Sequence, residues 1–293
     1  MSIDLSKVTA LSDQYGAIAQ LELGGSVIWA VKNDNKPIVL QVEKITSDTY
    51  AAETTYTAEE FILLDIYPKP YGTVSVTYGG FTKTITDTSG LEYANAQQVF
   101  FGTFNGVSDS VTTPASGELT IEGDYYAFSV GAYTKSSKAV NGAQCQCVKV
   151  IKSFGESTMI PDNAFSRNSN AGSNTTATAI VIPDSVLSIG HFAFYGWSAV
   201  KTVTIGRGVT SIGTQAFVTS NVLTEDRQYS LTTVKVLAET PPTVVPYEFT
   251  SGTKADLGFG AALEQIVVPK GRGNTYKVAE IWNEYADKIV EAS

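Results

Sequence analysis

The sequence predicts a mainly β protein in which a hairpin and a sandwich of short strands precede a stack of repeats that a C-terminal helix closes. Three observations support this prediction. Residues 36–133 contain short segments that alternate apolar and polar side chains between Gly, Pro, Asn or Asp residues. Beyond about residue 145, one pattern recurs every 23 to 32 residues, the longer intervals reflecting insertions. Near the C-terminus, apolar side chains are spaced by threes and fours, as in an amphipathic helix.

The composition restricts the classes of function. The chain has 293 residues, 43% hydrophobic and 17% charged, which suits about two domains at roughly 150 residues each. Its net charge of −9 disfavours binding to nucleic acid. One histidine and two cysteines disfavour a zinc site or a disulfide scaffold. No phosphate-binding loop, dinucleotide fingerprint or nucleophile elbow occurs in the sequence. We expect no catalytic residues, no metal ion and no cofactor.

The N-terminal residues and the lengths of the apolar runs indicate in which compartment the protein is expected to fold. The first residues lack the basic and apolar regions of a secretory signal. No apolar run approaches the roughly 20 residues that a membrane helix needs. We therefore expect folding in the cytoplasm and no insertion into a membrane.

Residues 1–35 are predicted to be an attachment hairpin or arm. Two short apolar runs lie on either side of Gly24-Gly25 within residues 17–31. A Gly-Gly pair readily adopts the positive φ angles of a two-residue hairpin turn. A polar turn at residues 33–35 then separates this piece from the next.

Residues 36–135 are predicted to form a β-sandwich. In the segment 73–78, Val74, Val76 and Tyr78 share one face, and threonine and serine take the other. Many short strands without a helical period are typical of an antiparallel sandwich, immunoglobulin-like in a loose sense. The seven expected strands lie near residues 38–42, 61–67, 73–78, 81–86, 98–104, 118–122 and 125–132.

The second half is a repeat array. Residues 182–194 align with residues 205–217 at a spacing of 23, and seven of the thirteen positions are identical. This period is that of leucine-rich repeats. A motif Ile-x-x-x-Ala-Phe occurs at residues 160–165, 189–194 and 212–217. A strand frame, apolar-x-x-apolar-x-apolar, predicts five rungs, at Cys145/Val148/Val150, Ala177/Ile180/Ile182, Val200/Val203/Ile205, Leu231/Val234/Val236 and Leu263/Ile266/Val268.

This pattern resembles the BspA-like class of leucine-rich repeats, which occurs in bacterial surface antigens. The resemblance covers about residue 148 to the C-terminus. It implies a leucine-rich-repeat solenoid over residues 136–293, with a helical cap from about residue 274 that reaches Ile289. It also implies adhesion or recognition rather than catalysis. The polar loops 166–176 and 221–230 are longer than a minimal repeat needs, and they either carry specificity or are disordered.

The absence of a recognisable secretion signal suggests a different route to the cell surface. Recognition modules without an export route are typical of bacteriophage virion proteins, because virions assemble in the host cytoplasm and leave by lysis. The front half is similar in architecture to N-terminal parts of phage tail or baseplate proteins. We therefore predict a homo-oligomeric tail-associated protein of the virion. Its N-terminal region would bind other virion proteins, and its C-terminal region would bind a bacterial surface protein or glycan.

The outward positions between buried ladder residues are the candidate ligand-binding stripe. They are Lys149, Val181, Thr204, Lys235 and Val267. Tyr195 and Trp197 add aromatic surface suited to sugar rings or protein partners. The only histidine, His191, shares its repeat position with Asp162 and Thr214, which favours an exposed polar position over a general base or metal ligand.

Three alternatives stay open at this point. The protein could be a capsid or tail decoration protein without a receptor of its own. It could be a bacterial surface adhesin. It could also be a glycan-degrading tail enzyme, because two carboxylates from distant parts of a chain can form a glycosidase pair.

Overall fold

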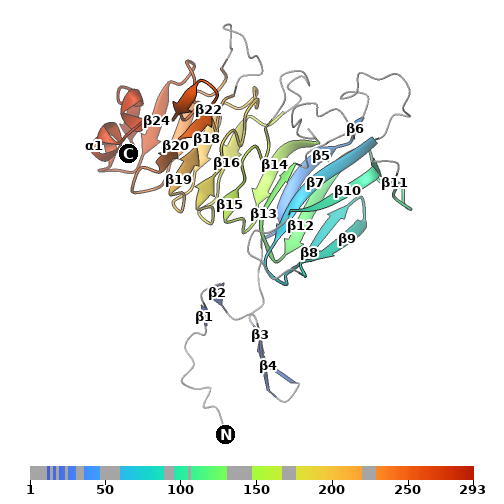
Figure 1. Cartoon of the computed structure of the whole chain (residues 1–293). Helices are drawn as coiled ribbons and strands as arrows, with labels where there is room; N and C mark the ends of the chain where they lie inside the picture. Colours follow the sequence, from blue (N-terminus) through green and yellow to red (C-terminus); the bar gives the residue numbers. More distant parts are fainter. Residues whose placement is uncertain are drawn as a thin grey trace. The chain divides into compact units, whose positions relative to one another are not determined.

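The structure is a computed structural model that describes seven stretches of the chain and four short strands before them. The chain forms two compact units, Met1–Lys36 and Pro37–Ser293, and Figure 1 traces the elements of each. None of the described helices is long and apolar enough to cross a membrane. The described stretches are residues 36–46, 60–88, 96–104, 107–130, 147–166, 176–219 and 229–293, and the four strands lie between residues 12 and 30.

The N-terminal unit contains two short antiparallel pairs. β1 (Ser12–Asp13) pairs with β2 (Gly16–Ala17), and β3 (Gln20–Leu23) pairs with β4 (Ser26–Ala30). The β3–β4 pair confirms the predicted hairpin. Its two glycines lie outside the described residues.

The second unit begins with a sandwich of two antiparallel sheets, as predicted. Alternation along each strand turns one face toward the core; in β8, Val74, Val76 and Tyr78 are buried while the residues between them are not. One sheet has the order β11-β10-β7-β13, with β6 also paired to β7, and the other has the order β14-β5-β12-β8-β9. The strands are β5 (Ile38–Glu43), β6 (Ile45–Thr46), β7 (Glu60–Pro68), β8 (Thr73–Tyr78), β9 (Phe81–Thr86), β10 (Gln97–Phe104), β11 (Val107–Ser108), β12 (Ser116–Gly123), β13 (Tyr125–Val130) and β14 (Val148–Phe154).

The strand β14 corrects the predicted start of the repeats. It pairs antiparallel with β5, so that Val148 lies opposite Val42 and Phe154 opposite Ile38. The prediction that Cys145, Val148 and Val150 form the first rung is therefore wrong, and the sandwich extends past residue 136. An apolar-x-x-apolar-x-apolar pattern suits any half-buried strand, and here β5 offers an open sheet edge.

The repeats contain two parallel ladders rather than one. Ladder A, predicted from the strand frame, consists of β16 (Ala179–Val181), β18 (Thr202–Ile205), β20 (Thr233–Val236), β24 (Gln265–Val268) and β25 (Ile289–Glu291). Ladder B consists of β15 (Met159–Ile160), β17 (Ser188–Ile189), β19 (Ser211–Gly213) and β21 (Thr243–Val245). It was not predicted as a set of strands, although the recurring Ile-x-x-x-Ala-Phe motif begins in β15, β17 and β19. The hairpin β22 (Tyr247–Phe249) and β23 (Gly252–Lys254) is inserted after β21.

The predicted register of ladder A is confirmed. Its inward row is fully buried and consists of Ile180, Val203, Val234 and Ile266, extended by Ile289. Each rung buries its apolar side chain against the neighbouring rungs, which is how a solenoid obtains a continuous core.

A column of aromatic rings fills the interior of the repeats. Its members Phe165, Phe194, Phe217 and Phe259 follow one another with centroid distances of 5.4, 5.6 and 6.1 Å. Rings of the sandwich meet the first member, since Phe128 lies 5.1 Å from Phe165. The sandwich therefore covers the N-terminal end of the repeat stack, and both share one core.

The C-terminal cap contains a helix, but a shorter one than predicted. α1 (Gly273–Val278) is followed by a 3-10 turn, Trp282–Tyr285, and then by the strand β25. The prediction that the helix continues to Ile289 is wrong. Tyr276 and Trp282 are buried in the core of the cap. Ile289 instead pairs with Ile266 and continues the inward row of ladder A.

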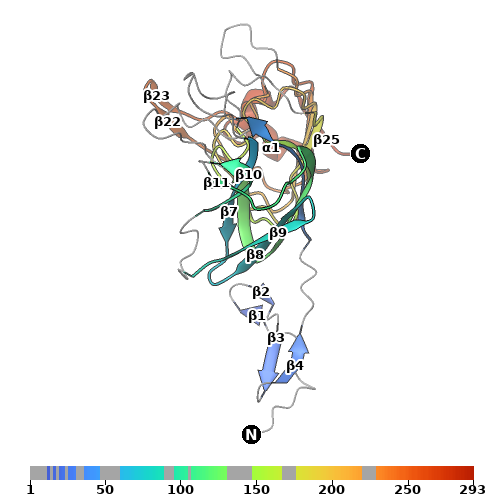
Figure 2. The same cartoon turned by 90° about the vertical axis from the view of Figure 1, so that its right-hand side faces the viewer.

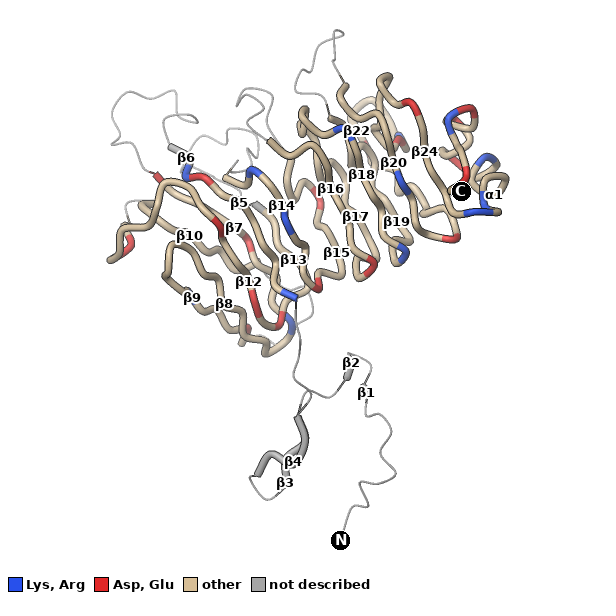
Figure 3. Tube along the Cα trace, turned by 180° about the vertical axis from the view of Figure 1, so that it is seen from behind, with Lys and Arg blue, Asp and Glu red and all other residues tan. Residues whose placement is uncertain are grey.

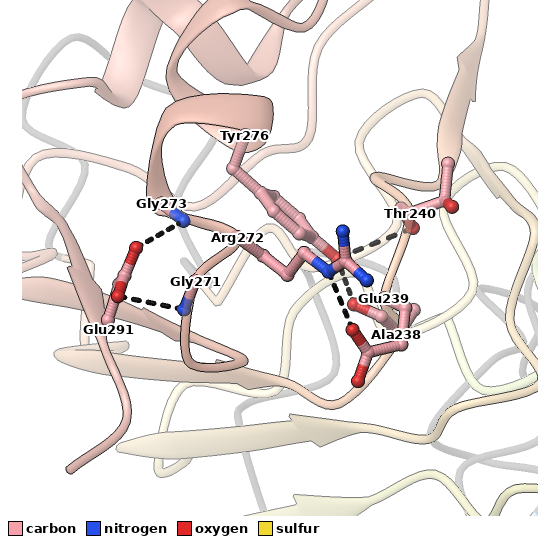
Figure 4. A network of polar contacts seen from close by, with 8 residues as sticks. All are labelled: Ala238, Glu239, Thr240, Gly271, Arg272, Gly273, Tyr276 and Glu291. Atoms are coloured by element: carbon pink, nitrogen blue, oxygen red, sulfur yellow. Dashed lines mark hydrogen bonds and ion pairs between the residues drawn. The ribbon is translucent and has the colours of Figure 1, made fainter.

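Polar contacts fasten the cap to the last repeats (Figure 4). The Tyr276 hydroxyl donates to the carbonyl of Ala238 at 2.8 Å, and Arg272 pairs with Glu239 at 2.7 Å. At the start of α1, the Glu291 carboxylate accepts from the backbone N–H groups of Gly271 and Gly273 at 2.9 and 2.8 Å. The Glu291 side chain, which extends from β25, thus caps the N-terminus of α1 in the way that an N-cap residue does.

This contact makes stability depend on pH. The N–H groups of Gly271 and Gly273 lower the pKa of Glu291, so its stabilising contribution is present at neutral pH and is lost as pH falls through the folded-state value. We expect Glu291→Gln to melt below the wild type at pH 7 and the gap in melting temperature to narrow toward pH 3. Glu280→Gln, exposed on the same cap, is the control. A difference in melting temperature between the wild type and Glu291→Gln that stays constant with pH would contradict this account.

Candidate recognition surface

The outward row of ladder A is the surface that the sequence analysis proposed. The registers align Val181 with Thr204, Thr204 with Lys235, and Lys235 with Val267, so these four candidates form one line across the sheet. Val290 extends the line by one strand, and it was missed because a helix was expected there. Val181 is 62% exposed and Val290 is 44% exposed. The row therefore offers a flat face with accessible apolar side chains.

Two other candidates have structural roles instead. Lys149 lies in β14 of the sandwich, away from the ladders, where its ammonium is 3.6 Å from the Glu43 carboxylate. Trp197 is 1% exposed, and its indole N–H donates to the Phe165 carbonyl at 2.7 Å. Its prediction as a contact residue is wrong, because the turn directs the indole into the aromatic column. Tyr195 is half-buried and lies against Phe192.

A hollow of about 460 Å³ lies over the outer face of ladder B. Its floor is made of small residues, Ser188, Gly190, Ser211 and Gly213, which leave room above the strands. Side chains of Tyr67, Met159, Asp162, His191 and Val245 contribute to its lining. The size falls in the range of about 300–1,000 Å³ that is common for ligand sites.

Equivalent side chains of successive repeats form a polar ladder beside the hollow. Asp162 Oδ1 accepts from the N–H of His191 at 2.7 Å, and His191 Nδ1 accepts from the N–H of Thr214 at 2.9 Å. Thr214 is buried, and its hydroxyl, with one proton to donate, lies 2.8 Å from the carbonyl oxygen of Val245 and 2.9 Å from that of Lys254. The polar position of His191 is thus half-buried and structural.

An aromatic cluster adjoins the hollow at His191. We use this name for His191, Phe192, Tyr195, Tyr247 and Phe249. The Tyr247 ring lies 5.1 Å from both His191 and Phe192, and 5.0 Å from Phe249, all in edge-to-face arrangements. Tyr247 is 39% exposed, and the other members are half-buried. The hairpin that carries Tyr247 and Phe249 projects from the repeats on the side away from β25 (Figure 2).

Residues 158–236 match the family model of the BspA type leucine-rich repeat region in six copies. The matched residues begin after β14, in agreement with the place of β14 in the sandwich. Ladder A continues beyond the matched residues with β24 and β25. No curated protein matches the chain. The match confirms the class of repeat that the sequence resembles and supports a role in surface adhesion or recognition.

Within the described residues, no group of three or more His, Cys, Asp or Glu side chains could hold a metal ion. The strands of ladder B carry no charged residue, and in Figure 3 the labelled strands β15, β17 and β19 are tan. Burial raises the pKa of Tyr67, with Asp65 and Asp162 nearby acting in the same direction, so its hydroxyl stays protonated at neutral pH.

The hollow and the aromatic cluster were not predicted. The cluster depends on the insertion 247–254, whose Tyr-x-Phe alternation before Gly252 is the one sequence signal that could have indicated an extra hairpin. The loops 166–176 and 221–230 lie mostly outside the described residues.

Proposed function

We propose that this protein recognises a bacterial surface by contact through its repeat region, without catalysing a reaction, as a tail-associated protein of a bacteriophage virion. The observation that carries the proposal is the aligned outward row of ladder A, with Val181, Lys235 and Val290 exposed along it. A rigid ladder fixes the spacing of these side chains before a partner arrives, which lowers the entropic cost of binding.

The architecture supports the placement in a virion. A small N-terminal unit, Met1–Lys36, is separate from the unit that holds the sandwich and the repeats. Such a division suits a protein that is fastened at one end and presents a recognition module at the other. Several copies in one particle would strengthen weak individual contacts by multivalency. The partners proposed are therefore virion proteins at the N-terminal unit and a bacterial surface protein or glycan at the repeats.

Attachment of the full-length protein to cells tests the recognition role. We expect fluorescently labelled protein to bind some strains of a bacterial panel, and Val181→Glu combined with Val290→Glu to lower the bound amount about tenfold. A buried carboxylate at the contact is unfavourable, whereas exposed positions tolerate substitution within about 0.5 kcal/mol in stability. Leu187→Glu, 53% exposed and outside the row, is the matched control.

The result separates the alternatives. Loss of attachment in the row variant but not in the control supports recognition through ladder A. Attachment by no strain contradicts it and favours a decoration protein. Gold-labelled antibody on particles that contain the chain tests the location: label at the tail supports the proposal, and label on the capsid contradicts it.

A further inference from the structure

We propose that the hollow over ladder B and the adjoining aromatic cluster form a binding site for an uncharged saccharide. The assignment deepens the proposed recognition function, on which it rests for the bacterial origin of the glycan, and it names a surface other than the outward row of ladder A. The parts of the site are the floor of small residues, the polar lining and the rings of the aromatic cluster.

The repeat conformation does not require an aromatic ring at position 192. Phe192 has a left-handed backbone with φ of 55°, and the equivalent residues Asn163 and Gln215 have φ of 54° and 57°. The repeat thus requires this conformation, which asparagine adopts readily, but it does not require a phenylalanine. The Phe192 ring instead packs on Tyr247 and Phe249, which the inserted hairpin supplies. A bulky ring at a backbone position that disfavours it suggests a role in binding.

The combination of rings and polar groups matches the surface of a sugar. A pyranose has an apolar C–H face and a rim of hydroxyl groups. Exposed aromatic side chains such as Tyr247 provide a flat apolar partner for the face. Around the hollow, the hydroxyls of Tyr67, Ser188 and Ser211 can donate to or accept from the rim, and the carboxylate of Asp162 can accept from it. A concave site with a few directed polar groups is the usual form of a small-ligand site.

The charges favour an uncharged ligand. Among the described residues that line the hollow, none is a lysine or an arginine, and Asp162 is the one carboxylate. The nearby Lys254 is already paired with Asp256 at 3.1 Å. An acidic sugar would therefore meet a carboxylate without a compensating cation, which is unfavourable.

The geometry favours a saccharide over an extended peptide. A peptide that adds to a sheet needs an open strand edge. The hollow lies over the faces of β17 and β19, each of which is paired on both sides within ladder B. A ligand there is bound through side chains and not through a shared backbone ladder.

Binding of neutral trisaccharides by the full-length protein tests the site. The probes are maltotriose, mannotriose, galactotriose and triacetylchitotriose, with sialyllactose as the anionic comparison, and saturation-transfer NMR is the measurement. We expect at least one neutral probe to bind and sialyllactose not to bind. Phe192→Asn, which copies the residue of the sister repeat, and Tyr247→Ala should each weaken binding at least tenfold.

The control is Tyr71→Asn, which removes an exposed tyrosine that also has a positive φ but lies in the sandwich. Binding by none of the four neutral probes, or equal binding by the site variants and the wild type, would overturn the assignment. So would cell attachment that depends on Phe192 and Tyr247 but is abolished by protease and not by periodate, since the partner would then be a protein. If the site variants attach to cells normally while the ladder A variant does not, the saccharide site is refuted and the proposed function stands.

Discussion

Replacing Phe194 by alanine is expected to lower the free energy of unfolding by about 3–5 kcal/mol. The Phe194 ring is fully buried in the aromatic column. It lies between Phe165 at 5.4 Å and Phe217 at 5.6 Å, almost parallel to the latter, and the edge of Trp197 closes a third side at 5.8 Å. The neighbouring rings cannot collapse into the space, because hydrogen bonds between repeats fix their backbones, such as that from the Phe194 N–H to the Ala216 carbonyl.

Urea denaturation followed by circular dichroism measures the change. The loss is a large fraction of the 5–15 kcal/mol that typically stabilises a domain, so the variant should unfold at a much lower urea concentration. Val181→Ala, in the same repeat region but 62% exposed, should change the stability by no more than about 0.5 kcal/mol. A loss below 1 kcal/mol for Phe194→Ala would show that the column is not close-packed.

Replacing Gly213 by alanine is expected to be the second most damaging change, with a loss of about 1–3 kcal/mol or more. A Cβ atom at this position would come within 3.0 Å of the N atom of His191 and the C atom of Gly190. Both are backbone atoms of the preceding repeat and cannot turn aside. The new methyl group must therefore push apart two rungs of ladder B, which breaks their register at the floor of the hollow.

Thermal unfolding of Gly213→Ala beside Gly117→Ala isolates this effect. Both substitutions remove the same backbone freedom from the unfolded chain. At Gly117, in β12, the added Cβ would meet only the ring of Tyr78 at an ordinary 3.5 Å. A fall in melting temperature for Gly213→Ala alone supports the close approach of the rungs, and similar melting temperatures for the two variants would argue against it.

The sequence by itself determined the sandwich strands and the inward row of ladder A. Local alternation fixes which face of a strand is buried, and a fixed period places Ile180, Val203 and Val234 in register. Both are patterns within or between neighbouring segments, so a single sequence contains them. The candidate stripe followed from the same register, and its members from Val181 to Val267 lie in one line.

Only the tertiary structure decided which sheet edge each strand pairs with. β14 has the pattern of a rung but joins the open edge of β5, and Ile289 has helical spacing but completes ladder A. The hollow and the aromatic cluster depend on contacts between Tyr67 of the sandwich, the repeat turns and an inserted hairpin. Periodicity specifies the buried face of a segment but not its partner, because the partner depends on which surfaces the rest of the chain leaves uncovered.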